Sequence, residues 1–382
     1  AKNLETYRYR MLEAAKANAA KNGYQGAQYP WESADDGTEQ CPDWTIEPDG
    51  TCYRCYVAVY EHHVTAAVAY GIYNYVRITH DTEFLLHKGA EILIETARFW
   101  KSRLQYIKEN DRYEIHRVTG PDEWHEPVDN NVYTNYLARW NLRYVTALTE
   151  MLSREYPQEY TALVEKLGLT EEEIADWDAV AAKVYLPRKE GTQLLEQFEG
   201  YFDLKEAVIE KYDSNDWPIR PEILNTTKKC ETQIIKQADV VMLLHLMGQE
   251  FDEETTKLNY SYYEKRTLHG SSLSPSIYSI MGLKVGDDSK AYRYLRRAAL
   301  IDLVNLQGNT REGIHAANAG GVWQVVVFGF AGVSLDEEGM LCICPHMPPE
   351  WNGLTFRIHH LDSWLEITVH ADNSGEGQGL EG

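Results

Sequence analysis

The chain has 382 residues, of which 43% are hydrophobic and 25% charged, a composition typical of globular proteins. Its net charge of −22 argues against nucleic acid and anionic membranes as partners, because both recruit clustered Lys and Arg. The longest apolar run, Val322–Val333, is too short to span a bilayer, which takes about 20 residues.

Helical periodicity dominates the beginning of the chain. Apolar residues recur at intervals of three and four over residues 1–21 and 56–79, and then from an expected N-cap at Asp81 to Leu104. The histidines inside the second helix are most simply packed, hydrogen-bonded core residues: His62 and His63. The segment between the first two helices, 26–39, is rich in turn formers and aromatics, so it predicts either a surface loop or the rim of a cleft.

A polar turn follows at Thr119-Gly-Pro-Asp-Glu-Trp-His-Glu126. Its carboxylates and imidazole are Asp122, Glu123, Glu126 and His125. A loop on a rigid scaffold can aim such groups into a cleft, where a desolvated carboxyl with a raised pKa can act as a general acid. The alternative is a capping loop, in which Asp129 or Asn130 caps a helix expected at about 131–152 and the acids are solvated.

The middle of the chain alternates helices with elaborated loops. A capping box at Thr170–Glu173 predicts a helix that ends near Val184, and residues 185–230 predict a long irregular segment of a kind that is often functional or flexible. Helical patterns return at 236–247, 252–266, 275–281, 289–305 and 316–330, the last interrupted at Asn318–Gly321. With almost no strand signal before residue 335, these helix pairs predict a mainly α toroid.

The pattern changes to period two after Gly339. We expect three strands of one small antiparallel sheet, at 340–344, 354–359 and 364–369. The tail from 372 to 382 is expected to be frayed. This divides the chain into a helical domain, 1–335, and a β-sheet segment, 336–382.

The six cysteines give little support for a metal site. Cys52 and Cys55 form a CxxC, but no second pair and no His pair at ligand spacing accompanies it, so we expect no metal. Cys342 and Cys344 fall on one face of an expected strand, which packing explains. A reduced cytoplasmic protein is the simplest account.

A second polar turn, His269-Gly-Ser-Ser-Leu-Ser274, precedes the helix expected from Pro275. Hydroxyls, an imidazole and backbone N–H groups would converge there on a positive helix end, which suits a phosphate. The alternative is that Ser272 or Ser274 only caps the helix. The pair Lys236-Gln237 opens another helix and is, on its own, equally well explained as a solvated pair.

Five blocks of the chain carry a family resemblance: Tyr29–Ser33, Gly120–Asn135, Ile235–Val240, His269–Ser279 and Glu312–Gln324. In content and order they resemble the inverting disaccharide phosphorylases of glycoside hydrolase family 65, which act on maltose, trehalose, kojibiose or nigerose. The resemblance covers nearly the whole chain. It implies an (α/α)6 barrel with a C-terminal sheet, and phosphorolysis of an α-linked glucose disaccharide to β-glucose 1-phosphate and glucose.

The resemblance also implies residue roles. Glu123 corresponds to the general acid, and inorganic phosphate takes the place of base-activated water. The implied phosphate contacts are His269, Ser271, Ser272, Gly320 and Gly321. The implied sugar contacts are Lys236 and Gln237, with Trp31 and Trp124 as further candidates. No cofactor besides phosphate, as co-substrate, is implied.

The resemblance further implies a homodimer and an N-terminal half that is missing here. Family members carry a β-sandwich and a Phe-Trp-Asp-Thr-Glu block before the first matched block, so we expect an incomplete barrel at the N-terminus of this chain. Two alternatives stay open. A family-related hydrolase would use water and a second carboxylate as base, and an inactive fragment would bind sugars weakly and turn nothing over.

Overall fold

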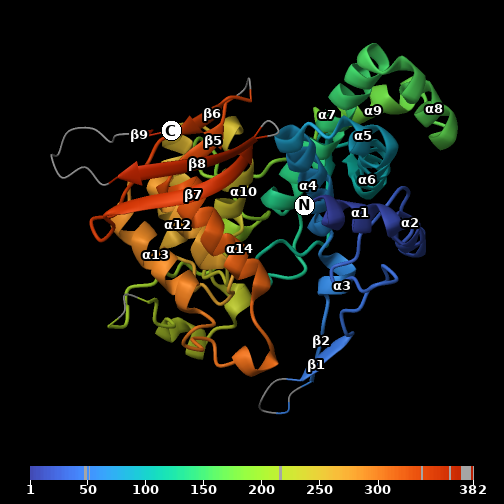
Figure 1. The fold of residues 1–382 in the computed structure, drawn as a ribbon. Coiled ribbons are helices and arrows are strands. Elements are labelled where there is room, and N and C mark those ends of the chain that lie inside the picture. Colours follow the sequence, from blue (N-terminus) through green and yellow to red (C-terminus); the bar gives the residue numbers. More distant parts are fainter. Residues whose placement is uncertain are drawn as a thin grey trace. The chain divides into compact units, whose positions relative to one another are not determined.

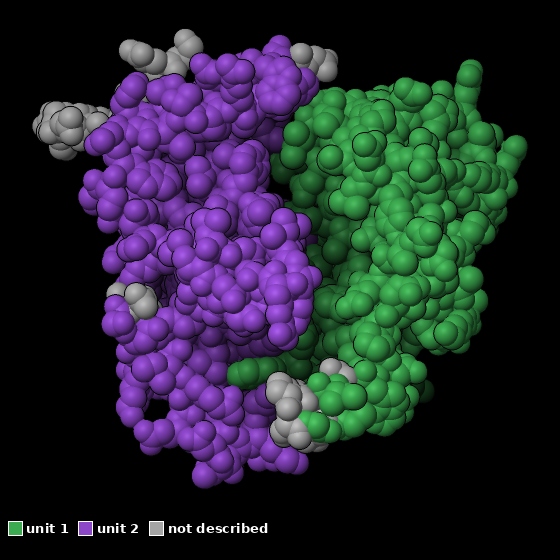
Figure 2. Space-filling model, turned by 60° about the horizontal axis from the view of Figure 1, so that its bottom comes forward, with its two compact units in different colours: residues 1–187, 196–200 green, residues 188–195, 201–382 purple. Residues whose placement is uncertain are grey.

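The computed structural model describes residues 1–46, 50, 52–214, 217–336, 339–360, 363–370 and 380–381. These residues form two compact units, coloured separately in Figure 2. Unit 1 contains residues 1–187 and 196–200, and unit 2 contains residues 188–195 and 201–382. The chain therefore enters unit 2, returns briefly to unit 1, and then completes unit 2.

Unit 1 is built from helices, drawn from blue to green in Figure 1. They are α1 (Lys2–Arg10), α2 (Leu12–Lys21), α3 (Val57–Tyr60), α4 (His63–Thr79), α5 (Thr82–Phe84), α6 (Ala90–Arg103), α7 (Val132–Glu155), α8 (Pro157–Leu167) and α9 (Glu171–Ala181), with a π-helical turn at Leu85–Gly89. Helix α6 is the centre of the core, because its side chains are buried on nearly every face, including Phe99 and Trp100. Burying side chains of this size contributes about 2 to 3 kcal/mol each.

Two predicted helices of unit 1 are each divided in the structure. The helix expected at 1–21 breaks at Met11, and the helix expected at 56–79 breaks after Tyr60, where Glu61 leaves the helical region with φ −89° and ψ 73°. After the break, His62 and His63 are buried, and both ring nitrogens of His62 make hydrogen bonds. The predicted cap at Asp81 is confirmed, since its side chain accepts a hydrogen bond from the Phe84 N–H at 3.0 Å.

The cap of α7 was expected at Asp129 or Asn130, and both assignments are wrong. Asn131 is the cap, and its side chain accepts from the Thr134 N–H at 2.9 Å. Asn130 instead adopts φ 55°, and its buried side chain accepts from the Ile115 N–H at 3.1 Å. Asn tolerates this left-handed conformation better than most residues, which frees the next position to begin the helix.

Short elements of unit 1 escaped prediction. Two hairpins are present, β1 (Trp44–Ile46) with β2 (Cys52–Arg54), and β3 (Gln105–Ile107) with β4 (Arg112–Glu114). Strands of three residues carry no readable alternation, so the expectation of almost no strand before residue 335 was wrong at these places. Helix α8 was also missed, whereas α9 begins after the predicted cap, Thr170.

Unit 2 begins with the irregular segment that the sequence predicted. Among its described residues up to 231, the regular elements are short 3-10 turns, at Tyr201–Asp203, Glu222–Asn225 and Lys229–Glu231. The helices follow: α10 (Val240–Leu246), α11 (Glu253–Glu264), α12 (Ser274–Lys284), α13 (Asp288–Leu300) and α14 (Ala316–Gln324), which continues as a π-helical segment at Val325–Phe330. The expected interruption at Asn318–Gly321 is wrong, because α14 runs through it.

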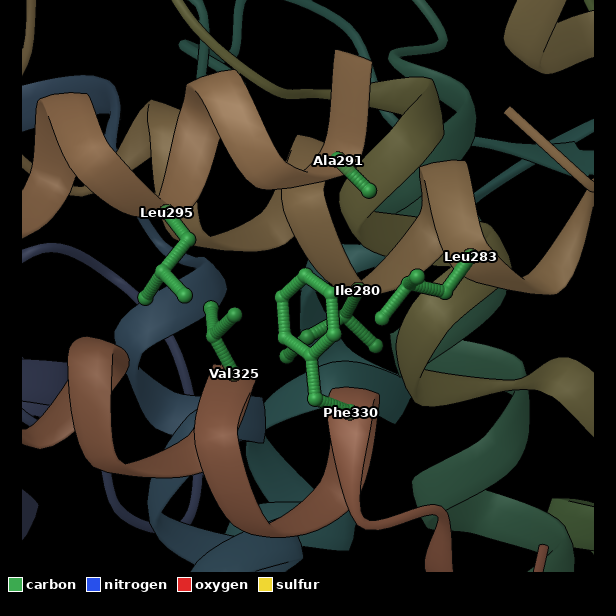
Figure 3. Close-up of a cluster of buried hydrophobic side chains, with 6 residues drawn as sticks. All are labelled: Ile280, Leu283, Ala291, Leu295, Val325 and Phe330. Carbon is green, nitrogen blue, oxygen red and sulfur yellow. The ribbon is translucent and has the colours of Figure 1, made fainter. Parts of the chain in front are cut away.

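The core of unit 2 lies where three helical segments meet. Figure 3 shows six buried side chains directed at one another: Ile280, Leu283, Ala291, Leu295, Val325 and Phe330. They come from α12, α13 and the segment that ends α14. Helix α12 is buried along most of its length, so the residues before it are held on a well-fixed element.

The C-terminal strands belong to unit 2. β5 (Val333–Leu335) pairs with β6 (Leu341–Ile343), whereas β7 (Gly353–His360) and β8 (Ser363–His370) lie side by side in a second sheet that includes β9 (Leu380–Glu381), as Figure 1 shows. The expectation of one sheet containing 340–344 is therefore wrong. Cys344 is exposed and lies outside β6, so packing does not explain it. Most of the tail predicted to fray, 372–382, lies outside the described residues.

The part of the chain that the structure describes contains no helix long and apolar enough to cross a membrane. The run Val322–Val333 instead packs inside unit 2, where Val327, Ala331 and Val333 form a buried cluster with side chains of β7.

Two adjacent glycines of α14 predict opposite effects of the same substitution. A Cβ at Gly321 would lie 2.6 Å from Ser276 Oγ and 3.0 Å from its Cβ, whereas a Cβ at Gly320 would meet nothing within 4 Å. We expect Gly321→Ala to lower the free energy of unfolding by about 1 to 3 kcal/mol, because α12 and α14 must separate. Gly320→Ala should raise it by up to about 1 kcal/mol, because Ala favours a helix interior. Urea unfolding of both variants measures this, and equal shifts would contradict the packing described.

Candidate active site

The 119–126 turn is anchored at both ends in unit 1. Val118 and Val128 exchange backbone hydrogen bonds at 2.8 and 2.9 Å, which closes the base of the turn. The Thr119 N–H donates to the Tyr60 carbonyl at 3.0 Å and ties the turn to the break between α3 and α4. The turn is therefore an ordered feature of the unit and not a solvated cap of α7.

A buried polar cluster holds the turn from inside. Asp122 and His125 are 1% and 2% exposed, and His125 Nδ1 donates to Asp122 Oδ2 at 2.6 Å. Gln197 Nε2 donates to the same oxygen at 3.0 Å, and the Trp124 N–H donates to Asp122 Oδ1 at 3.3 Å. A buried carboxylate with several donors is satisfied and rigid, and removing any donor leaves an uncompensated charge.

The residues between the buried ones are partly exposed. Glu123 and Trp124 are half-buried, and they sit between the buried pair Asp122 and His125. The arrangement fixes the backbone of Glu123 on both sides while leaving its carboxyl partly accessible. A carboxyl placed in this way can transfer a proton to a bound molecule, which a fully buried one cannot.

The structure brings Trp31 to the same part of unit 1. Its indole makes an edge contact with the His63 ring at 6.1 Å, and the His63 ring makes another with Tyr133 at 5.4 Å. The segment 26–39 therefore packs against α4, and the 119–126 turn is tied to the break just before that helix by the Thr119–Tyr60 hydrogen bond.

His62 and His63 are packed core residues, as predicted. His62 Nε2 donates to the Val59 carbonyl at 2.9 Å, and His62 Nδ1 accepts from Arg103 Nε at 3.1 Å. Burial, and then the neighbouring Arg103 guanidinium, lowers the pKa of His62 to about 3. Burial likewise lowers the pKa of His63 to about 4, so both rings are neutral near pH 7.

This neutrality predicts acid sensitivity. An unfolded histidine binds a proton below about pH 6.5, whereas folded His62, with a pKa of about 3, stays neutral until the pH is far lower. The contribution of each such histidine to the free energy of unfolding is therefore fully present above pH 6.5. It falls by about 1.4 kcal/mol per pH unit as the pH drops below that value. Between pH 4 and 6, we expect His62→Gln to reduce the slope of the free energy of unfolding against pH by about 1.4 kcal/mol per pH unit, the contribution of one proton. Urea unfolding at several pH values measures this slope. His87→Gln, at an exposed position, should leave the slope unchanged.

The second predicted group lies within unit 2. Ile235 and Thr267 form a parallel bridge, and the next residues continue it, since the Leu268 N–H donates to the Ile235 carbonyl at 3.0 Å. The Gly270 N–H donates to the Lys236 carbonyl at 2.8 Å, and a Cβ on Gly270 would lie 3.3 Å from Lys236 Cγ. The half-buried pair Lys236-Gln237 therefore lies beside the 269–274 turn.

His269 is bonded at both ring nitrogens. Tyr294 donates its hydroxyl proton to Glu264 Oε1 at 3.0 Å, so its oxygen accepts from His269 Nε2 at 3.2 Å. His269 Nδ1 then accepts from the Ser274 hydroxyl at 2.9 Å. Burial, and then the charge of Arg297, lowers the pKa of His269 to about 3, so the ring is neutral. With φ 52°, His269 holds an unusual backbone conformation of the kind found at functional sites.

The serines of this turn do not cap α12. The residue before the helix is Leu273, and no side chain caps it, so the interpretation of Ser272 or Ser274 as an N-cap is wrong. Ser271 and Ser272 are half-buried, and Ser271 Oγ accepts from the Leu273 N–H at 3.3 Å. Gly321 of α14 packs against Ser276 in the first turn of α12, so the predicted glycine pair lies close to the same helix end.

The predicted residues thus form two groups. Unit 1 holds Glu123, Trp124 and Trp31, and unit 2 holds Lys236, Gln237, His269, Ser271, Ser272, Gly320 and Gly321. Within unit 2, Lys236 lies beside the 269–274 turn, and Gly321 lies against Ser276 in the helix that follows it. Among the described residues, no three His, Cys, Asp or Glu side chains are placed to hold a metal ion.

Sequence reasoning missed the residues that support the two turns. Gln197 lies in the irregular segment, 75 residues from Asp122, and nothing local marks it. Tyr294 and Glu264 come from helices whose sequence shows only periodicity. Asp122 and His125 did carry a signal, because their spacing of three within a proline-containing turn allows the two side chains to meet.

Comparisons with known proteins agree with this fold. The glycosyl hydrolase family 65 central catalytic domain matches residues 1–324, and the C-terminal domain of that family matches residues 336–374. A solved structure of a candidate kojibiose phosphorylase from the human microbiome superposes with a TM-score of 0.84 and 31% identity over 97% of this chain and 47% of that chain. The fold class is therefore mainly α, of the (α/α)6-barrel type followed by antiparallel sheets, as predicted. The chain belongs to glycosyl hydrolase family 65.

Curated relatives are similar along nearly the whole chain. The kojibiose phosphorylase of Thermoanaerobacter brockii is 54% identical over 97% of this chain and 48% of that protein. The α,α-trehalose phosphorylase of the same organism is 36% identical over 98% of this chain and 46% of that protein. The chain spans about half the length of the curated relatives it matches.

Proposed function

We propose that this chain carries the catalytic part of an inverting phosphorylase for an α-linked glucose disaccharide, with kojibiose as the first substrate to test. The observation that carries the proposal is the 119–126 turn, in which a buried Asp122–His125 pair fixes a half-buried Glu123. Similarity to kojibiose phosphorylases at up to 54% identity supports the substrate class.

In the proposed reaction, Glu123 donates its proton to the glycosidic oxygen. The bond between that oxygen and the anomeric carbon breaks, and glucose leaves with the proton. An oxygen of inorganic phosphate attacks the anomeric carbon from the opposite face and forms the new bond, so an α-linkage becomes β-glucose 1-phosphate. Because phosphate is already an anion, no second carboxylate is needed as a base.

The unit 2 group supplies the proposed phosphate and sugar contacts. Ser271 and Ser272 donate to phosphate from the turn before α12, with the backbone at Gly320 and Gly321, and Lys236 and Gln237 contact the transferred glucose. His269 belongs to this site as the residue that fixes the turn, because both of its ring nitrogens bind protein groups. Trp31 and Trp124 offer flat apolar faces to the sugars.

The test is release of β-glucose 1-phosphate from kojibiose, trehalose, maltose and nigerose, with and without inorganic phosphate. We expect phosphate-dependent release from one of them, kojibiose first. Glucose release indifferent to phosphate would place the protein with the family hydrolases, and no turnover of any sugar would favour a non-catalytic fragment.

A double variant, Ser271→Ala with Ser272→Ala, tests the phosphate site itself. We expect a higher KM for phosphate and an unchanged KM for the disaccharide. The matched control replaces two exposed serines of unit 2, Ser334→Ala with Ser363→Ala, and should behave like the parent. An unchanged phosphate KM in the first variant would remove these serines from the site.

The proposal includes a cytoplasmic homodimer that needs no cofactor besides phosphate. The family resemblance supports all three features. Light scattering after size exclusion tests the dimer, and full activity after dialysis against a chelator tests the absence of a metal requirement.

A further inference from the structure

A cavity of about 1010 Å³ runs along α13 in unit 2. Helix α13 forms one wall, from Asp288 to Leu300, and the segments 212–214 and 346–350 supply others, together with Trp217. The volume matches the upper end of small-molecule sites. Neither Ser271 nor Ser272 lines it, so it is not the proposed phosphate turn.

The wall of this α13 cavity carries more positive than negative side chains. Its cations are Lys290, Arg293, Arg296 and Arg297, and its acids are Glu264, Asp288 and Glu350. Lys290 is neutralised, because its Nζ lies 2.9 Å from Glu264 Oε2. In a chain with net charge −22, a cluster of arginines on one helix is a local reversal of sign.

Arg297 is the most informative of these residues. It is half-buried, and its guanidinium stacks on the Trp217 ring at 4.0 Å from the centroid. Within the described residues it makes no hydrogen bond or ion pair, and burial lowers its pKa despite the charge of Asp213. A desolvated guanidinium with five donors ordinarily has a carboxylate or carbonyl partner, so these donors are suited to a ligand.

We propose that the α13 cavity binds a phosphate group, with Arg297 as its principal contact. The planar guanidinium matches two phosphate oxygens at once, which an isolated lysine does not. The cavity is far larger than inorganic phosphate requires, and its tyrosines and carboxylates suit a polyhydroxylated body. The chemistry therefore favours a phosphate monoester of a small sugar, with free inorganic phosphate as the other source of the same group.

The cavity shares a wall with the support of the 269–274 turn. Trp217 and Tyr294 line it and also pack against the His269 ring, with centroids 5.2 and 4.8 Å apart. The cavity site thus stands beside the proposed active site without using its serines. This allows the two sites to be removed separately by mutation.

Calorimetric titration of the protein with glucose 6-phosphate, and separately with inorganic phosphate, tests the proposal. Glucose 6-phosphate is chosen because it is not a product of the proposed reaction. We expect Arg297→Gln to weaken its binding by roughly tenfold or more, the effect of losing a charged, bidentate contact. Arg293→Gln should weaken it less, and Arg357→Gln, on exposed β7, should leave it unchanged. Near-UV circular dichroism of each variant confirms its fold.

The outcomes separate the two sources and the two sites. If glucose 6-phosphate binds and its binding depends on Arg297, the ligand of the cavity is a sugar phosphate. If only inorganic phosphate binds in this way, the cavity is a phosphate site and its ligand is the free ion. Binding that persists in folded Arg297→Gln overturns the proposal, as does no binding of either probe or binding lost in Ser271→Ala with Ser272→Ala. None of these results depends on whether the protein cleaves a disaccharide.

Discussion

Glu123→Gln is expected to lower phosphorolysis of the disaccharide by a factor of roughly 100 to 10,000, the usual contribution of general acid catalysis. Glutamine keeps the size of the side chain but has no proton to give to the glycosidic oxygen. The glucose leaving group would then depart as a poor anion. The expected signature is a fall in kcat, with little change in the free energy of unfolding, because Glu123 is half-buried and lies outside the buried Asp122 cluster.

Two comparisons make this prediction specific. α-Glucosyl fluoride, whose leaving group needs little protonation, should be used by Glu123→Gln much closer to the parental rate. Glu109→Gln, the same change at an exposed position of unit 1, should leave both rates as they are. A disaccharide rate near the parental value in Glu123→Gln would remove Glu123 from the reaction.

The second large effect is expected at Asp122. In Asp122→Asn, an amide NH2 replaces either Oδ2, which accepts from His125 Nδ1 and Gln197 Nε2, or Oδ1, which accepts from the Trp124 N–H, so at least one donor loses its acceptor. Disrupting the partners of a buried carboxylate costs about 3 to 5 kcal/mol of stability. We expect a loss at the lower end of this range, because the amide oxygen still accepts the remaining bonds.

The same variant should also lose activity, through the position of Glu123. We expect kcat to fall while KM for both substrates changes little, since Asp122 is buried. Urea unfolding and steady-state kinetics measure the two effects, and Asp178→Asn, at an exposed position of α9, is the control. Parental kcat in a destabilised Asp122→Asn would show that the cluster supports the fold without positioning Glu123.

The sequence predicted best what local chemistry determines. Asp81 and Thr170 were identified as caps because an N-cap needs one side chain and an N–H three residues later, all within a single turn. The packed, hydrogen-bonded state of His62 followed from its place on an apolar helix. The two polar turns stood out because glycine and polar or charged side chains concentrate there, next to prolines.

What the sequence did not predict depends on residues far apart in the chain. Gln197 completes the Asp122 cluster from an irregular segment, and Tyr294, on the next helix but one, accepts a hydrogen bond from His269. His269 was expected to contact phosphate because it lies in a polar turn before a helix and matches the family's phosphate site. Its bonds to Ser274 and Tyr294 became visible only with tertiary structure, because they depend on packing between α12 and α13.

The path of the chain through the two units has a consequence for how the protein can be made or divided. Residues 1–187 cannot complete the support of the 119–126 turn by themselves, because Gln197 arrives later, after residues 188–195 have been committed to unit 2. During synthesis, the 119–126 turn therefore lacks its Gln197 donor until the first residues of unit 2 have been made. A gene divided at residue 187 would separate Asp122 from Gln197, so the two units cannot be separated by a single cut without loss of this contact.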